Sequence, residues 1–201
     1  PNSYKLDAEE QVGYYTSLAS QIPGPLMLYN IPSIAHMSIP IPVLERLSEQ
    51  PNIIGFKDSE NDTERLEAVL GALGGRAGFS ILAGVTALSV RALGLGADGI
   101  VPSVGNLVPR VCQDLFESSM AGDLVTAGQY QQQLDEIGEI YRARRTLGQS
   151  LAALKAAMGA LSLCGPDVLP PLRLLDAGEQ EKVQRQFREW RESQEDLRQQ
   201  A

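Results

Sequence analysis

The sequence predicts an α/β protein built on a parallel sheet, and three observations carry this prediction. Short apolar runs bounded by Gly or Pro recur in the first half of the 201 residues. Between them lie segments with helical spacing of apolar residues, each long enough to cross over a sheet so that the next strand runs parallel. The centres of the apolar runs are roughly 20 to 28 residues apart, the spacing of a βα repeat.

Four runs are expected to be strands covered on both faces, because they are too short to be buried helices. These runs are 26–32, 53–57, 79–84 and 98–102. The expected crossover helices are 8–21, 42–49, 63–73 and 86–93. Only helices are expected afterwards, at 107–120, 123–143, 149–163 and 179–200, with a proline-rich break at 166–171. The predicted domains are therefore a strand-containing part, 1–122, and a helical extension, 123–201.

Four strands leave two architectures open. A closed (β/α)₈ barrel needs eight strands and about 250 residues. The chain is therefore either an open doubly wound sheet or the second half of a barrel. The opening segment Pro1-Asn2-Ser3-Tyr4 resembles a loop that follows a strand, and we expect the half-barrel.

Composition excludes several classes of function. A formal net charge of −8 argues against nucleic-acid binding, which needs a basic face. The single histidine disfavours a zinc or iron site, and Cys112 and Cys164 are expected to be reduced core residues. No run approaches the roughly 20 apolar residues of a membrane span, and no signal-peptide pattern opens the sequence. The expected location is the cytoplasm.

Lys57 is the first candidate catalytic residue, because of the four lysines it alone ends an apolar strand. Alternation along the strand places Ile53, Gly55 and Lys57 on one face. In a barrel interior Gly55 would leave room beside the amine, and burial would favour the neutral form that attacks carbonyl groups. A lysine that reaches solvent, or that pairs with Asp58, explains the sequence pattern equally well.

Tyr29 is the second candidate, near the end of the preceding strand. Adjacent strands lie about 4.8 Å apart, so a phenol and an amine can converge on one small ligand. Active sites of parallel barrels form at this carboxyl end, where a tyrosine can transfer protons. A core tyrosine with a satisfied hydroxyl is the alternative.

These two residues stand within longer motifs: Leu28-Tyr-Asn-Ile-Pro32, Asn52-Ile-Ile-Gly-Phe-Lys-Asp-Ser59, Leu82-Ala-Gly84 and Gly96-Ala-Asp-Gly-Ile-Val-Pro-Ser103. In order and spacing they resemble the dihydrodipicolinate synthase/N-acetylneuraminate lyase superfamily of pyruvate-dependent class I aldolases. The resemblance covers nearly the whole chain, which would correspond to the C-terminal two-thirds of a member.

The resemblance implies a (β/α)₈ TIM barrel with C-terminal helices, usually a homotetramer. It implies that Lys57 forms a Schiff base with pyruvate or another 2-oxo acid, that Tyr29 moves protons, and that Val101 and Gly84 lie against the ligand. No metal or organic cofactor is required, because the iminium itself withdraws electrons. The family's Gly-Thr-Thr loop, which binds the substrate carboxylate, belongs to the half that this sequence lacks.

Several positions depart from the family. Dihydrodipicolinate synthases usually have arginine at the position of Ile34, so aspartate semialdehyde is disfavoured as the second substrate. N-acetylneuraminate lyases usually have acidic residues after the glycine at position 84, where this chain has Val85. The family's second tyrosine would fall near Ser3, beside Tyr4. His36 is expected at the surface, with contact to the aldehyde half of the substrate as the alternative.

We therefore expect a lyase that forms or cleaves a carbon–carbon bond on a 2-oxo acid, with a small, weakly charged aldehyde as partner. One rival is dihydrodipicolinate synthase proper, or a Schiff-base dehydratase of the same superfamily. The other is a half-barrel without catalytic activity.

Overall fold

The computed structural model describes residues 4–200, and side chains up to residue 195. The chain divides into two compact units. The first comprises residues 4–103 and 114–128 of the described chain, and the second comprises 104–113 and 129–200. The predicted domain boundary after residue 122 stays a prediction.

The first unit is built on one parallel sheet, with strand order β1-β2-β3-β4. The strands are β1 (Leu26–Asn30), β2 (Ile53–Asp58), β3 (Ser80–Ala83) and β4 (Gly99–Ile100). Its helices are α1 (Ala8–Gln21), α2 (Pro32–Ala35), α3 (Ile41–Leu47), α4 (Thr63–Leu73) and α5 (Ser89–Gly94). A 3₁₀ turn, η1 (Thr86–Leu88), precedes α5. All four predicted strands and four crossover helices are therefore confirmed.

Local capping explains why the predictions for α1 and α4 are correct to the residue. The Asp7 carboxylate accepts a hydrogen bond from the Glu10 amide, and the Glu10 side chain accepts one from the Asp7 amide. Asp62, the predicted N-cap of α4, accepts from the Arg65 amide at 3.0 Å. Such bonds satisfy amides that the first helical turn leaves without partners.

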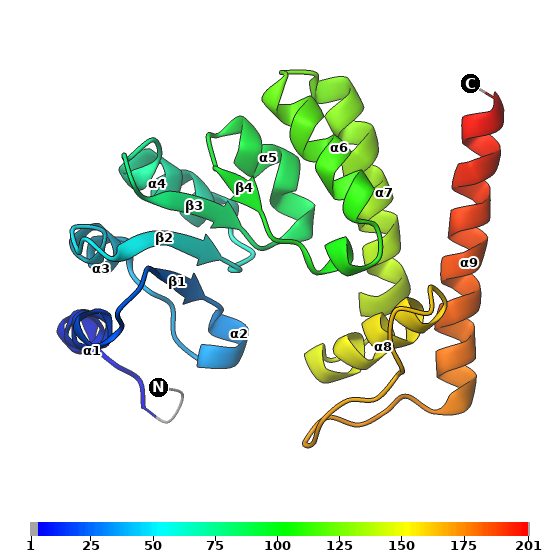
Figure 1. Ribbon diagram of the computed structural model, residues 1–201, viewed down its shortest axis with the longest axis horizontal. Coiled ribbons are helices and arrows are strands. Elements are labelled where there is room, and N and C mark those ends of the chain that lie inside the picture. The colour runs from blue at the N-terminus through cyan, green and yellow to red at the C-terminus, as the bar shows by residue number, and fades with distance from the viewer. Residues whose placement is uncertain (1–3, 201) are drawn as a thin grey trace. The chain divides into compact units, whose positions relative to one another are not determined.

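Helices α1, α3 and α4 cover one face of the sheet (Figure 1). The core there includes a row of buried residues from three neighbouring strands, Leu28, Phe56 and Ile81, which are aligned in register. Leucine and valine side chains of α3 and α4 pack against them: Val43, Leu44, Leu47, Leu66, Val69, Leu70 and Leu73. The opposite face is much more open, since Met27 is 39% exposed and Tyr29 is 45% exposed.

A register shift between Leu26 and Met27 corrects one prediction. Ile53 was expected on the face of Lys57, but it lies in the helix-covered core with 2% of its surface exposed. Ile54 is 40% exposed instead. An irregularity in the ladder breaks the strict alternation of side chains, and the sequence carries no signal for it.

The strand ends also differ from expectation. β1 ends at Asn30 rather than residue 32, because Pro32 begins α2, and proline is well suited to the first helical position. β4 has only two residues, and Gly96 just before it has a φ of 97°, a conformation that favours glycine.

The second unit is helical within the residues described, and its principal helices are α8 (Leu147–Gly159) and α9 (Ala177–Gln200), which pack together. The helices α6 (Pro109–Met120) and α7 (Leu124–Arg142) contribute to both units, and η2 (Ser103–Asn106) precedes α6. Cys112 and Cys164 are free and half-buried, and burial raises the pKa of the Cys112 thiol to about 11. None of the helices described is both long and apolar enough to span a bilayer.

Candidate active site at the carboxyl end of the sheet

The ends of β1 and β2 bring the two predicted catalytic side chains together. Tyr29 and Lys57 are register partners on adjacent parallel strands, so their side chains leave the sheet on the same face. The Lys57 Nζ atom lies 4.1 Å from the centre of the Tyr29 ring. Lys57 is partly buried. The strand spacing predicted that the Lys57 amine and the Tyr29 phenol lie close together, and the structure has this arrangement.

Tyr29 has an altered acidity in this position. Burial by itself raises the pKa of the phenol, but hydrogen bonding with Ser59 and Lys57 and the positive charge of Lys57 outweigh it. The pKa of Tyr29 therefore lies below the ordinary tyrosine value. A phenol with a lowered pKa releases its proton more readily than a tyrosine in water.

Gly84 gives the Lys57 side chain its space. A β-carbon at position 84 would stand 2.9 Å from Lys57 Cε and 2.9 Å from the Asp58 carbonyl oxygen, and it would overlap Ser59 Oγ. Sequence reasoning assigned this role to Gly55, and that assignment is wrong. The atoms nearest to a β-carbon at Gly55 are the Ser80 backbone and the Met27 side chain.

Beneath the site, a buried polar network holds the ends of β1 and β2 together. Asn30 donates to Asp58 at 2.8 Å and to Glu60 at 2.9 Å, and Arg65 donates to Asp58 at 2.9 Å. Arg65 also donates to the Ile39 carbonyl group at 2.9 Å. Asp58 thus pairs with Arg65, which argues against the suggested pairing of Lys57 with Asp58. The bond from Arg65 to the Ile39 carbonyl group holds the loop after β1 against this pair.

The remaining predicted site residues lie around this centre. Val101 follows β4, and its amide donates to the Ala83 carbonyl at 2.8 Å; its side chain is 43% exposed. Ile34 is 44% exposed and lies in α2. His36 caps α2 in a left-handed conformation and is exposed, which agrees with the expected surface position. Ser3 lies outside the described residues, and Tyr4 is 74% exposed.

A cavity of about 250 Å³ adjoins Tyr29. It lies between the start of α1 and the loop after β1, and its walls include Gln11, Tyr15, Ile34 and Ala35. Sequence reasoning missed Gln11, Tyr15 and Ser59 as site residues. The only sequence signal for Gln11 was a polar residue at a buried position of α1, and this signal does not show which group Gln11 faces.

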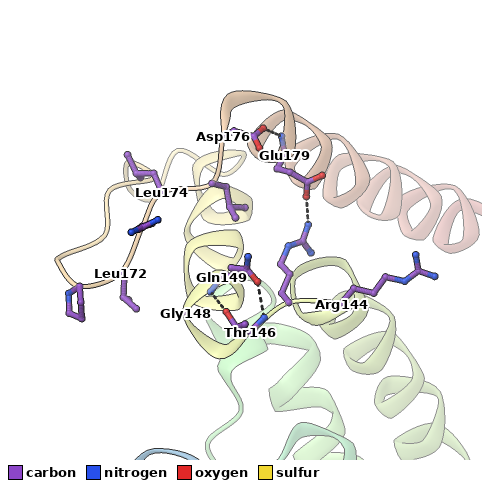
Figure 2. Close-up of a pocket in the computed structure, with 12 residues that line it drawn as sticks. Arg144, Thr146, Gly148, Gln149, Leu172, Leu174, Asp176 and Glu179 are labelled. Carbon is purple, nitrogen blue, oxygen red and sulfur yellow. Dashed lines mark hydrogen bonds and ion pairs between the residues drawn. The ribbon is translucent and has the colours of Figure 1, made fainter.

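A larger cavity, of about 540 Å³, belongs to the second unit (Figure 2). Its polar groups largely satisfy one another: Arg145 pairs with Glu179 at 2.8 Å, and Thr146 caps α8 together with Gln149. Arg144 extends away from the other labelled side chains (Figure 2). This cavity offers no arrangement of nucleophile and proton donor comparable with Lys57 and Tyr29. Among the side chains described, those of residues 4–195, no three His, Cys, Asp or Glu gather in a way that could hold a metal ion.

Comparison with known proteins identifies the family. A sequence profile of the Dihydrodipicolinate synthetase family matches residues 1–189. The chain belongs to this family. The resemblance found in the motifs around Tyr29 and Lys57 is thereby confirmed.

Similar proteins of this family extend the finding to the fold. The 4-hydroxy-tetrahydrodipicolinate synthase of Halorhodospira halophila is 28% identical over 180 residues, covering 89% of this chain and 58% of the relative. The solved dihydrodipicolinate synthase of Bacteroides thetaiotaomicron has a TM-score of 0.87 at 27% identity, covering 94% of this chain and 64% of that one. YagE of Escherichia coli K12, solved in complex with pyruvate, has a TM-score of 0.85 at 25% identity, covering 95% of this chain and 64% of YagE.

The chain thus spans about three fifths of the length of the curated relatives it matches. The four parallel strands are part of a TIM barrel of the dihydrodipicolinate synthetase family, and the open doubly wound alternative is excluded. The expected homotetramer stays a prediction.

Proposed function

We propose that this family member is a class I lyase that forms or cleaves a carbon–carbon bond next to a 2-oxo acid, with Lys57 as the Schiff-base residue. The observation that carries the proposal is the contact of the Lys57 amine with the Tyr29 ring at 4.1 Å, at the carboxyl ends of adjacent strands. Family membership and the pyruvate complex of YagE support the choice of substrate class.

The proposed reaction begins at the Lys57 nitrogen, which forms a bond to C2 of the 2-oxo acid. The ketone oxygen takes up two protons, one from the Lys57 nitrogen and one from a proton donor, and leaves as water, and the product is a positively charged C=N bond. In the cleavage direction the C3–C4 bond breaks, its electron pair forms an enamine, and C4 leaves as an aldehyde after its hydroxyl group loses a proton. Protonation of C3 and hydrolysis of the imine then release the shortened 2-oxo acid.

In this proposal Tyr29 transfers these protons. Its lowered pKa makes it a better proton donor to the departing oxygen than an ordinary tyrosine. In the cleavage step the phenolate would accept the hydroxyl proton. Ser59, whose hydrogen bonding contributes to the lowered pKa, orients the phenol.

The cavity beside Tyr29 bears on the second substrate. All ten residues that line it have uncharged side chains: Leu6, Gln11, Tyr15, Tyr29, Asn30, Ile31, Ile34, Ala35, Met37 and Ile39. A charged carboxylate would lose hydration there without gaining a cation. This favours an uncharged aldehyde over aspartate semialdehyde, the substrate of the rival synthase.

Trapping with borohydride tests the proposal on the full-length protein. Pyruvate followed by borohydride is expected to leave a reduced adduct on Lys57, located by mass spectrometry of peptides. The Lys57→Ala variant should lose the adduct, and a control variant of an exposed lysine in the same unit, Lys5→Ala, should keep it. Absence of any adduct, or equal labelling of Lys57→Ala, would contradict the proposal and favour a half-barrel without Schiff-base chemistry.

A further inference from the structure

Asn30 and Asp58 directly follow Tyr29 and Lys57 along the chain, and their side chains bond to each other. They are register partners and the last residues of β1 and β2. The Asn30 amide group donates to the Asp58 carboxylate at 2.8 Å, and the two residues are only 1% and 6% exposed. Side chains alternate along a strand, so this bond lies on the helix-covered face of the sheet, opposite to the phenol and the amine. The strands are therefore tied together one residue beyond the proposed catalytic pair.

The Asn30 side chain uses its donors and its acceptor at the same time. Besides the bond to Asp58, its Nδ2 atom donates to Glu60 at 2.9 Å, and its Oδ1 atom accepts from the Ile39 amide at 3.0 Å. Rotating the amide by half a turn would bring its oxygen against two carboxylates, so these contacts fix its orientation. An aspartate of the same shape has no donors when ionised, and a leucine has neither donor nor acceptor. The network therefore needs an amide at position 30.

Charged partners strengthen the bonds of Asn30. Both carboxylates that it contacts also face Arg65, whose Nε atom lies 2.9 Å from Asp58 and 3.2 Å from Glu60. Hydrogen bonds with an ionised partner are shorter and roughly twice as strong as neutral ones. The ends of an element open more readily than its centre. The network therefore opposes opening at the last register pair of β1 and β2, next to the proposed catalytic residues.

We propose that Asn30 is a positioning residue for the Schiff-base reaction, and that it keeps the Lys57 amine against the Tyr29 phenol by tying their strands together. This inference rests on the proposed function, because Asn30 acts only through these two side chains. It lies on the other face of the sheet and is not itself a catalytic residue. Without the tie the strand ends can separate, and a displacement of about 1 Å costs on the order of 100-fold in rate.

Asn30→Ala tests this role in the full-length protein, with Asn52→Ala as the matched control. Asn52 donates to the Ala19 carbonyl group at 2.6 Å, so it also ties β2 to a neighbouring element, but one residue before the strand begins. Both variants lose hydrogen bonds and are expected to lose stability. Only Asn30→Ala is expected to slow imine formation between pyruvate and Lys57, by about 10- to 100-fold, measured by borohydride quenching of folded protein. Equal rates in the two variants overturn the inference.

The acidity of Tyr29 gives a readout that a merely structural role would not change. Burial raises the pKa of the phenol, and hydrogen bonding with Ser59 and Lys57 and the charge of Lys57 bring it below the ordinary tyrosine value. If the amine moves away from the phenol, this pKa should rise. Ultraviolet titration, taken as the difference from the same protein with Tyr29→Phe, should show a higher Tyr29 pKa in Asn30→Ala and the wild-type pKa in Asn52→Ala. An unchanged Tyr29 pKa in Asn30→Ala overturns the inference.

A second pair of variants applies if Asn30→Ala does not fold. Asn30→Asp places a carboxylate against Asp58, whereas the double variant Asn30→Asp/Asp58→Asn restores a donor and an acceptor between the two positions and keeps the net charge of the wild type. Slow imine formation in the single variant and recovery in the double variant support the inference. A single variant as fast as the wild type, or a double variant as slow as the single one, overturns it.

The titration separates this inference from the proposed function, because it needs no substrate. Absence of a borohydride adduct on the wild type contradicts the Schiff-base proposal, while a raised Tyr29 pKa in Asn30→Ala still shows that Asn30 holds the phenol against the amine. An adduct on the wild type, together with a Tyr29 pKa that Asn30→Ala leaves unchanged, supports the Schiff base and overturns the role of Asn30.

Discussion

Replacing Gly84 by alanine perturbs the proposed site through a single methyl group. The added carbon would lie 2.9 Å from Lys57 Cε, whereas carbon atoms in favourable contact are about 3.5 to 4.0 Å apart. The lysine side chain must therefore move by about 0.6 to 1.1 Å. Ser59 must rotate away as well, but the Asp58 carbonyl oxygen belongs to the backbone and cannot.

The expected consequence is a large loss of rate with a smaller loss of stability. A misplacement of about 1 Å costs on the order of 100-fold in rate, because the reacting atoms leave their productive geometry. Overpacking of this kind destabilises the fold by about 1 to 3 kcal/mol. The assay measures the rate at which Lys57 forms the imine with pyruvate. Samples are quenched with borohydride at successive times, and the reduced adduct on Lys57 is quantified.

Gly71→Ala serves as the matched control. Gly71 is exposed within α4, with no atom within 4 Å of a β-carbon placed there. We expect an unchanged rate and a gain of roughly 0.5 to 1 kcal/mol in stability, because alanine favours helices. A Gly84→Ala protein that forms the imine at the wild-type rate would refute the assignment of Lys57 to a site confined by Gly84.

Two further predictions concern the acidity of the site and the network beneath it. Because the pKa of Tyr29 is lowered, this phenol loses its proton at a lower pH than an ordinary tyrosine. The proposed first step needs the protonated phenol, so kcat/KM should fall as the pH rises through that lowered pKa. Tyr29→Phe should lower kcat by about 10²- to 10⁴-fold and abolish this fall of kcat/KM at high pH, and Tyr14→Phe serves as an exposed control. The same fall in Tyr29→Phe would show that another group titrates. Arg65→Met leaves the buried carboxylate of Asp58 without its cation and should reduce the free energy of unfolding in urea by about 3 to 5 kcal/mol. Arg46→Met, which removes an exposed pair with Glu9, should reduce the free energy of unfolding far less, because solvent screens exposed charges, and equal losses in the two variants would contradict the importance of burial.

Capping explains why some element boundaries were predictable from sequence and others were not. The starts of α1 and α4 depend on Asp7 and Asp62, whose hydrogen bonds reach only three residues along the chain. The end of β1 depends on competition between strand and helix at Pro32, and the short helix α2 was not predicted. Signals of short range are readable in one sequence, whereas the outcome of such competition depends on packing.

The sequence by itself determined the order of strands and helices, the half-barrel, and the placement of Tyr29 and Lys57 at adjacent strand ends. The order of the elements and the placement of the two side chains follow from apolar periodicity and from the geometry that every parallel sheet shares. The half-barrel was chosen over an open sheet because of the opening segment and the family resemblance. Only the tertiary structure decided that Gly84 rather than Gly55 gives space to the amine, that Ile53 turns into the core, and that Gln11 meets the cavity beside Tyr29. Each of these depends on strand register or on contacts between segments distant in sequence, and neither leaves a trace in the local pattern of residues.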